Sequence, residues 1–171
     1  PDVKILVGGY WNNSVSSVKD IKLSDYTNII LNFHCYEPFI FTHQAAHWVP
    51  AFPKDFSLRF PASICVYAEL FKKYFPDMLQ PFLDHTKGKR VIDSDYFESL
   101  FAEAIAYAEK LDVPMYCGEY GVIDRAPTDA TLKWYEEINA AFCNLGIARC
   151  AWTYKEMDFG LSDSRLDNVR E

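Results

Sequence analysis

One carboxylate stands near the end of a strongly apolar stretch, where an ionised group is costly to bury. The stretch reads VPMYCGEYGV over residues 113–122, and Glu119 lies between Gly118 and Gly121. A buried charge needs either a partner or a chemical purpose, so Glu119 is a salt-bridged structural acid or a functional residue. The two glycines would let backbone or a ligand approach the carboxylate closely.

Polar and aromatic residues also stand at the ends of the other apolar segments. Taken alone, His34 or Trp152 would equally suit a packed core. Because the carboxyl ends of parallel strands meet at one edge of a sheet, four segments ending in this way predict a ligand site there. The set comprises Trp11 and Asn12 after residues 3–9, His34 and Tyr36 in 28–36, Glu119 in 113–121, and Trp152 and Tyr154 in 147–155.

The elements that must position this set alternate between strands and helices. Apolar, buried strands are expected at 3–9, 28–36, 113–121 and 147–155, and a short helix is expected at 14–23. This order predicts an α/β fold with a parallel sheet and right-handed crossovers. A helix is also expected within 64–84, broken by Pro76 and Pro81. No GxGxxG or P-loop pattern supports nucleotide binding.

Two helices are clearer because their apolar residues recur at three- and four-residue steps. Ser94 or Asp95 is expected to cap the first, with Glu98 as its capping-box partner. Thr128 or Asp129 begins the second, and Gly146 follows its end. The predicted core faces are Phe97, Phe101, Ala104, Ala108 and Leu111 in the first helix, and Leu132, Tyr135, Ile138 and Phe142 in the second.

Composition excludes several classes of protein. The 171 residues, half of them apolar, suit one domain over 1–171, and the net charge of −7 argues against nucleic-acid or anionic-membrane partners. No segment approaches a membrane span, and no leader peptide is visible. The five scattered cysteines are expected to be buried, unpaired hydrophobes. His43 and His47 have metal-ligand spacing, but no carboxylate or cysteine nearby completes a set, so no metal or cofactor is expected.

Aromatic residues make up 16% of the chain, which suits a sugar partner. Indole and phenol rings offer broad, rigid faces to the apolar C–H side of a pyranose. Trp11, Trp48 and Trp152 are the candidates, with core or rim packing as the alternative for each.

Several of these segments resemble glycoside hydrolase family 5, the cellulase family. NFHCYEPFIFTHQAAHW (32–48) is similar to the region after the sixth strand of that family's barrel. CGEYG (117–121) resembles its seventh-strand motif. VGGYWN (7–12) and AWTYKEMDFGL (151–161) resemble the ends of its fifth and eighth strands. The order and the spacing of the matches agree over nearly the whole chain.

The resemblance implies that Glu119 is the catalytic nucleophile of a retaining hydrolase that cleaves internal β-1,4-glucosidic bonds in cellulose-like polysaccharide. His34 and Tyr36 would line the catalytic centre. Trp152 would stack on the sugar beside the cleaved bond, with Trp11, His43 and Trp48 as further substrate contacts. The resemblance also implies an extracellular enzyme that binds β-glucan polymers or oligosaccharides.

The resemblance covers strands five to eight only, so the expected fold is half of a TIM (β/α)8 barrel. The family's acid/base glutamate belongs to an Asn-Glu-Pro motif after strand four, which does not occur in this sequence. Three explanations stay open: part of a longer barrel, pairing with a second half-barrel chain or another copy, or a substitute acid among Glu37, Glu156 and Asp158. A carbohydrate-binding half-barrel without catalysis, or an inactive fragment, is the alternative function.

Overall fold

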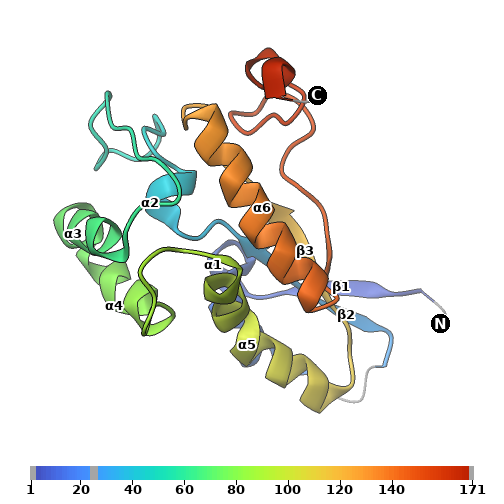
Figure 1. The fold of residues 1–171 in the computed structure, drawn as a ribbon. Coiled ribbons are helices and arrows are strands. Elements are labelled where there is room, and N and C mark those ends of the chain that lie inside the picture. The colour runs from blue at the N-terminus through green and yellow to red at the C-terminus, as the bar shows by residue number, and fades with distance from the viewer. Residues whose placement is uncertain (1–2, 24–26, 170–171) are drawn as a thin grey trace.

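The chain forms a four-stranded parallel sheet whose strand order follows the sequence (Figure 1). The computed structural model describes residues 3–23 and 27–169. The strands are β1 (Ile5–Gly8), β2 (Ile29–Cys35), β3 (Met115–Tyr120) and β4 (Ala148–Arg149). All three neighbouring pairs are parallel. The predicted α/β class with a parallel sheet is therefore confirmed.

Helices fill the connections between the strands. The short ones are α1 (Tyr10–Asn13), the 3₁₀ turn η1 (Val15–Asp20) and α2 (Phe39–Thr42), and a further 3₁₀ turn, η2 (Ser164–Val169), follows β4. The longer ones are α3 (Ile64–Tyr74), α4 (Pro76–Asp84), α5 (Ser94–Leu111) and α6 (Thr128–Asn144). Pro76 separates α3 from α4 as the sequence predicts, but α4 continues through Pro81. The helix expected at 14–23 is the shorter η1.

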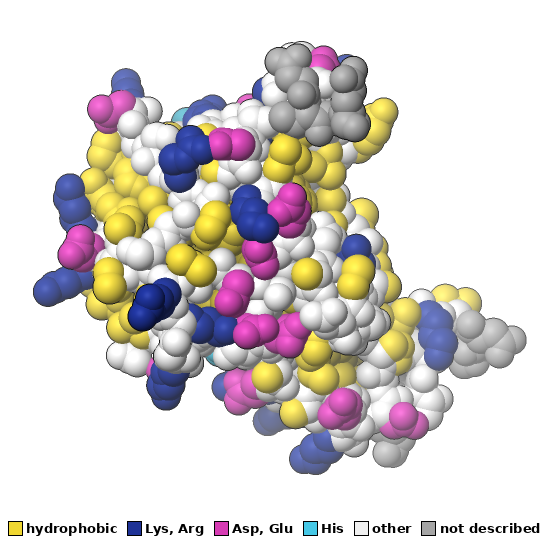
Figure 2. Space-filling model, in the orientation of Figure 1, with side chains coloured by type: hydrophobic (Ala, Val, Ile, Leu, Met, Phe, Trp, Pro, Cys, Tyr) yellow, Lys and Arg dark blue, Asp and Glu magenta, His cyan; other side chains and the backbone are white. Residues whose placement is uncertain are grey.

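Helices α5 and α6 lie side by side against one face of the sheet, and aromatic rings fill the space between them (Figure 1). The Phe101 ring lies 5.2 Å from Phe33 of β2 and stacks at 5.3 Å on Phe142 of α6. Trp134 of α6 is fully buried and donates its indole N–H to the Glu37 carbonyl at 2.9 Å. Charged side chains of both signs are interspersed over the outer helical face (Figure 2).

Two details of these helices differ from expectation. Asp93, not Ser94 or Asp95, caps α5, because its carboxylate accepts the Tyr96 N–H at 3.1 Å. Glu98 makes no capping box and instead accepts a hydrogen bond from Asn144 at 2.8 Å. In α6 the buried face is centred on Trp134, whereas the predicted Leu132 and Tyr135 are only partly buried, as is Leu111 at the end of α5.

The outer strands are more exposed and shorter than predicted. β1 was expected to be buried, but Ile5 and Leu6 are 51% and 54% exposed because β1 has a neighbour on one side only. β4 has two residues, although Trp152 N–H still donates to the Tyr120 carbonyl at 2.9 Å beyond its end. The expected burial of the cysteines holds for Cys35 and Cys117 only, since the other three free cysteines, Cys65, Cys143 and Cys150, are exposed.

None of the helices in residues 3–23 and 27–169 combines the length and apolar content needed to span a membrane.

The Phe101 ring is the central packing element of this core, so we expect Phe101→Ala to lower the free energy of unfolding by about 3–5 kcal/mol. Chemical denaturation followed by circular dichroism measures this change. Val66→Ala on α3 is the control, because Val66 is 40% exposed and a surface substitution should change stability by less than about 0.5 kcal/mol. Equal losses for the two variants would contradict this packing.

Candidate active site

A one-residue register shift brings Glu119 and His34 to the same face of the sheet. Phe33 pairs with Cys117, but the next residue, His34, pairs with Glu119, so Gly118 is the extra residue of a bulge. Side chains alternate between the faces of a strand, so without the shift Glu119 would point to the same face as Cys117. Bulges of this kind commonly re-aim a side chain beside an active site.

Two side chains of β2 and its extension meet the Glu119 carboxylate. The Tyr36 hydroxyl donates a hydrogen bond to Glu119 Oε2 at 2.9 Å. His34 Nδ1 lies 3.2 Å from the same oxygen, although the ring is turned so that no hydrogen bond forms. The carboxylate is 26% exposed and His34 is 9% exposed, so substrate could reach Glu119 while the protein orients it.

Burial sets the protonation of the groups around Glu119. It raises the pKa of the Tyr36 hydroxyl, and the Glu119 charge raises it further, so Tyr36 remains a donor at neutral pH. Burial also lowers the pKa of His34, an effect that the Glu119 charge opposes. The pKa of His43 falls to about 4 through burial. Both histidines are therefore neutral near pH 7.

A pocket of about 200 Å³ lies at the carboxyl ends of the strands. His34 and Tyr36, the two residues beside Glu119, line it, whereas Glu119 itself is not among its lining residues. Four of the residues predicted for the site line it together: Trp11, His34, Tyr36 and His43. Asn12, Ser14, Glu37 and Phe39 complete the lining, and of these only Asn12 belonged to the predicted strand-end set. Trp11 is 81% exposed and stands at the rim.

Trp48 and Trp152 do not line this pocket. The Trp48 ring lies 6.3 Å from His43 and 6.4 Å from Phe159, and 44% of Trp48 is exposed. Trp152 is 36% exposed, and its carbonyl lies against Gly121, where a Cβ would come within 2.3 Å. At Gly121, therefore, the group that approaches closely is the backbone carbonyl of Trp152.

The three carboxylates considered as substitute acids have different surroundings. The Glu37 carboxylate accepts hydrogen bonds from the Tyr36 N–H at 2.9 Å and the Cys35 thiol at 3.4 Å, and burial raises its pKa. Asp158 pairs with Arg125 at 3.3 Å. Glu156 is 77% exposed beside Lys155. Of the three, only Glu37 lines the pocket.

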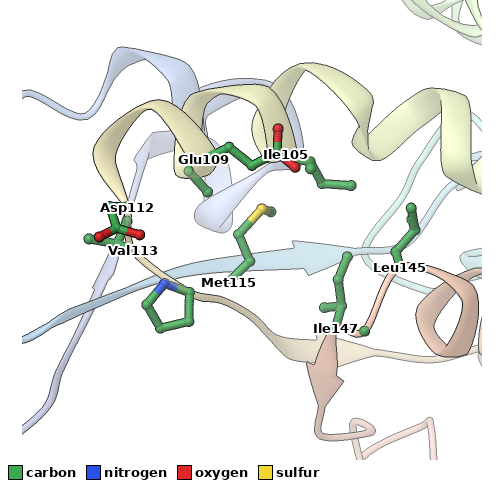
Figure 3. Close-up of a pocket in the computed structure, with 10 residues that line it drawn as sticks. Ile105, Glu109, Asp112, Val113, Met115, Leu145 and Ile147 are labelled. Atoms are coloured by element: carbon green, nitrogen blue, oxygen red, sulfur yellow. The ribbon is translucent and has the colours of Figure 1, made fainter.

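A larger hollow of about 440 Å³ lies at the opposite end of the sheet (Figure 3). Its walls come from the last turns of α5, the start of β3 and residues 145–147 after α6, including Ile105, Met115 and Ile147. Ligands of parallel α/β folds bind at the carboxyl ends of the strands, so this hollow is not a candidate substrate site. The part of the chain that the structure describes holds no cluster of three or more metal-ligating side chains.

Residues 1–158 match the cellulase family, glycosyl hydrolase family 5. The chain belongs to this family. Cellodextrinase A of Ruminococcus flavefaciens is 36% identical over 156 residues, which are 91% of this chain and 38% of that protein. Endoglucanase C of Acetivibrio thermocellus is 32% identical over 157 residues, 91% of this chain and 44% of that protein.

Solved structures of the family show the same architecture. Thermotoga maritima Cel5A in complex with cellobiose superposes with a TM-score of 0.69 at 21% identity, covering 94% of this chain and 43% of that one. A hyperthermophilic endo-β-1,4-glucanase in complex with substrate gives a TM-score of 0.63 at 27% identity, covering 93% and 42%. The chain thus spans less than half the length of these relatives and forms half of a (β/α)8 barrel, as predicted.

The partly buried, neutral His43 should make stability depend on pH. The unfolded chain protonates His43 near its ordinary pKa of 6.5, whereas the folded chain does so only near pH 4. The folded state then binds fewer protons, so this contribution is complete above pH 6.5 and is lost as pH falls toward 4.

We expect His43→Phe to remove a slope of up to about 1.4 kcal/mol per pH unit from the unfolding free energy between those pH values. Urea denaturation of both proteins across this range measures the difference. Identical slopes would show that His43 titrates normally in the folded chain.

Proposed function

We propose that this chain provides the nucleophile half of a retaining β-1,4-glucan hydrolase, with Glu119 attacking the anomeric carbon. The observation that carries the proposal is the convergence of Tyr36 and His34 on one oxygen of Glu119 beside an open pocket. A covalent glycosyl-enzyme intermediate requires an oriented carboxylate that can reach the anomeric carbon.

In this mechanism a Glu119 oxygen bonds to C1 of the sugar while the bond to the leaving oxygen breaks. A separate acid protonates that oxygen, and water later displaces Glu119 from C1. The Tyr36 hydroxyl donates to the carboxylate before attack, because its raised pKa keeps it protonated. The donated hydrogen bond fixes the direction of the attacking oxygen.

The proposed substrate is a β-1,4-linked glucan, polymer or oligosaccharide, and the proposed location is extracellular. The names of the matched relatives, an endoglucanase and a cellodextrinase, support this class of substrate. A Thermotoga maritima Cel5A structure with mannotriose marks mannan as the competing backbone. The exposed Trp11 and Trp48 rings supply sugar-stacking faces near the pocket, with Trp152 and His43 as further contacts.

The acid/base is proposed to come from the other half of the barrel, outside these 171 residues. Residues 1–171 would then act as one (β/α)4-type unit that a complementary half, or a second copy, completes. The exposed edge strand β1 and the short edge strand β4 support this pairing, because open sheet edges normally acquire a neighbour.

A second candidate function is carbohydrate binding without cleavage. The 81% exposure of Trp11 and the 44% exposure of Trp48 favour it, because such faces bind sugar whether or not an acid is present. Calorimetric binding of cello-oligosaccharide without release of reducing ends would support binding alone.

A substrate that needs no acid tests Glu119 directly. We expect 2,4-dinitrophenyl 2-deoxy-2-fluoro-β-cellobioside to label Glu119 covalently, because its leaving group departs without a proton. The leaving oxygen of cellulose does need a proton, so without a general acid this chain should hydrolyse cellulose about 10²–10⁴-fold more slowly than with one. Peptide mass spectrometry locates the label.

Glu119→Gln should abolish the labelling, and Glu69→Gln, at an exposed position on α3, should not. Labelling that persists in Glu119→Gln would show that Glu119 is not the nucleophile.

The sugar-stacking role of Trp48 predicts that Trp48→Ala weakens cello-oligosaccharide binding by roughly tenfold, or about 1.4 kcal/mol. Calorimetry with the Glu119→Gln background avoids turnover during the measurement. Met78→Ala is a matched control, since Met78 is an exposed apolar side chain on α4. Unchanged affinity for Trp48→Ala would place Trp48 outside the sugar-binding surface.

A further inference from the structure

Two asparagine side chains approach the same ring nitrogen of His34. Asn13 Nδ2 lies 3.3 Å from His34 Nε2, and Asn32 Nδ2 lies 3.5 Å from it. An amide NH₂ group only donates hydrogen bonds, so the single lone pair of Nε2 accepts, shared between the closer Asn13 amide and the longer Asn32 contact. A neutral imidazole carries one proton, which is then on Nδ1.

The backbone brings Asn13 and Asn32 to His34 from two directions. Asn32 is on β2, two residues before His34. Asn13 is the last residue of α1, the short turn after β1, and has left-handed backbone with φ of 56°, a conformation that asparagine adopts more readily than most residues. Ser14 forms an isolated parallel bridge with His34, which holds this turn beside the ring.

Two glycines leave the space that the amide groups occupy. A Cβ at Gly8 would come within 2.0 Å of Asn13 Oδ1, and a Cβ at Gly118 would come within 2.4 Å of Asn32 Oδ1. A side chain at Gly8 or Gly118 would therefore force the neighbouring asparagine amide to move. Gly8 and Gly118 therefore permit the positions that Asn13 and Asn32 take beside His34.

The other ring nitrogen faces the carboxylate. His34 Nδ1 is buried and has no hydrogen-bond partner among the residues that the structure describes, and Glu119 Oε2 is 3.2 Å away. A proton on Nδ1 is attracted to the carboxylate, whereas a lone pair there would be repelled.

We propose that Asn13 and Asn32 are positioning residues that hold His34 as the Nδ1–H tautomer, so that a proton rather than a lone pair faces Glu119. The proposal rests on the proposed function in one respect. The tautomer affects catalysis, by orienting the nucleophile and balancing its charge, only if Glu119 is that nucleophile. The tautomer itself is a property of the chain without substrate.

Long-range ¹H–¹⁵N correlation of the histidine rings in the full ¹⁵N-labelled chain reads the tautomer directly. At pH 7 we expect His34 to show a protonated Nδ1 and an unprotonated Nε2. A protonated Nε2 in the wild-type chain would overturn the proposal. The spectrum needs no catalysis, so failure of the labelling at Glu119 would count against the proposed function and leave this result standing.

Asn13→Asp replaces the donor with an acceptor of the same shape, so we expect it to shift His34 toward the Nε2–H form. Asn12→Asp is the matched control, because it adds the same charge one residue away, at a position for which no hydrogen bond to His34 is seen. Gly8→Ala, which displaces the Asn13 amide, should also reduce the Nδ1–H population. An unchanged His34 tautomer in both Asn13→Asp and Gly8→Ala, or an equal change in Asn12→Asp, would overturn the proposal.

Discussion

The one-residue shift in register between β2 and β3 is the constraint on which the candidate site depends. Strand geometry gives alternate residues to opposite faces, so Cys117 and Glu119 would otherwise share the buried face with Phe33. The bulge at Gly118 moves Glu119 to the face of His34 and leaves Cys117 in the core. Glycine suits this position because a Cβ there would collide with the Asn32 amide.

The loop after β2 keeps the partners of Glu119 in place. The Thr42 hydroxyl, fully buried, donates to the Tyr36 carbonyl, and its oxygen lies 3.1 Å from His43 Nδ1. Gln44 is also fully buried and bonds both the N–H and the carbonyl of Leu58, which ties the two ends of the long aromatic loop together. The buried polar side chains of Thr42 and Gln44 therefore hold this apolar loop in its conformation.

The sequence predicts the parallel sheet and the residues around Glu119 because both depend on local patterns. Apolar runs identify β2 and β3, and polar residues at their ends identify His34, Tyr36 and Glu119. The bulge depends on pairing between distant segments, so a strand pattern alone does not reveal it, although Gly118 next to the carboxylate is consistent with one. The asparagine pair was missed for the same reason, since Asn13 reaches His34 only through the left-handed turn after β1. Exposure of β1 depends on which strands lie beside it, and no property of residues 5–8 encodes that.

The central claim is that Glu119, oriented by the bulge and by the Tyr36 hydrogen bond, is the nucleophile that bonds to C1 of the sugar. A crystal structure of the chain after reaction with the fluorinated cellobioside tests it most directly. We predict continuous density from a Glu119 carboxylate oxygen to C1 of the sugar, with the Tyr36 hydroxyl and the His34 ring still beside that carboxylate. Density joining the sugar to Glu37 or to any other side chain, with Glu119 free, would contradict the claim.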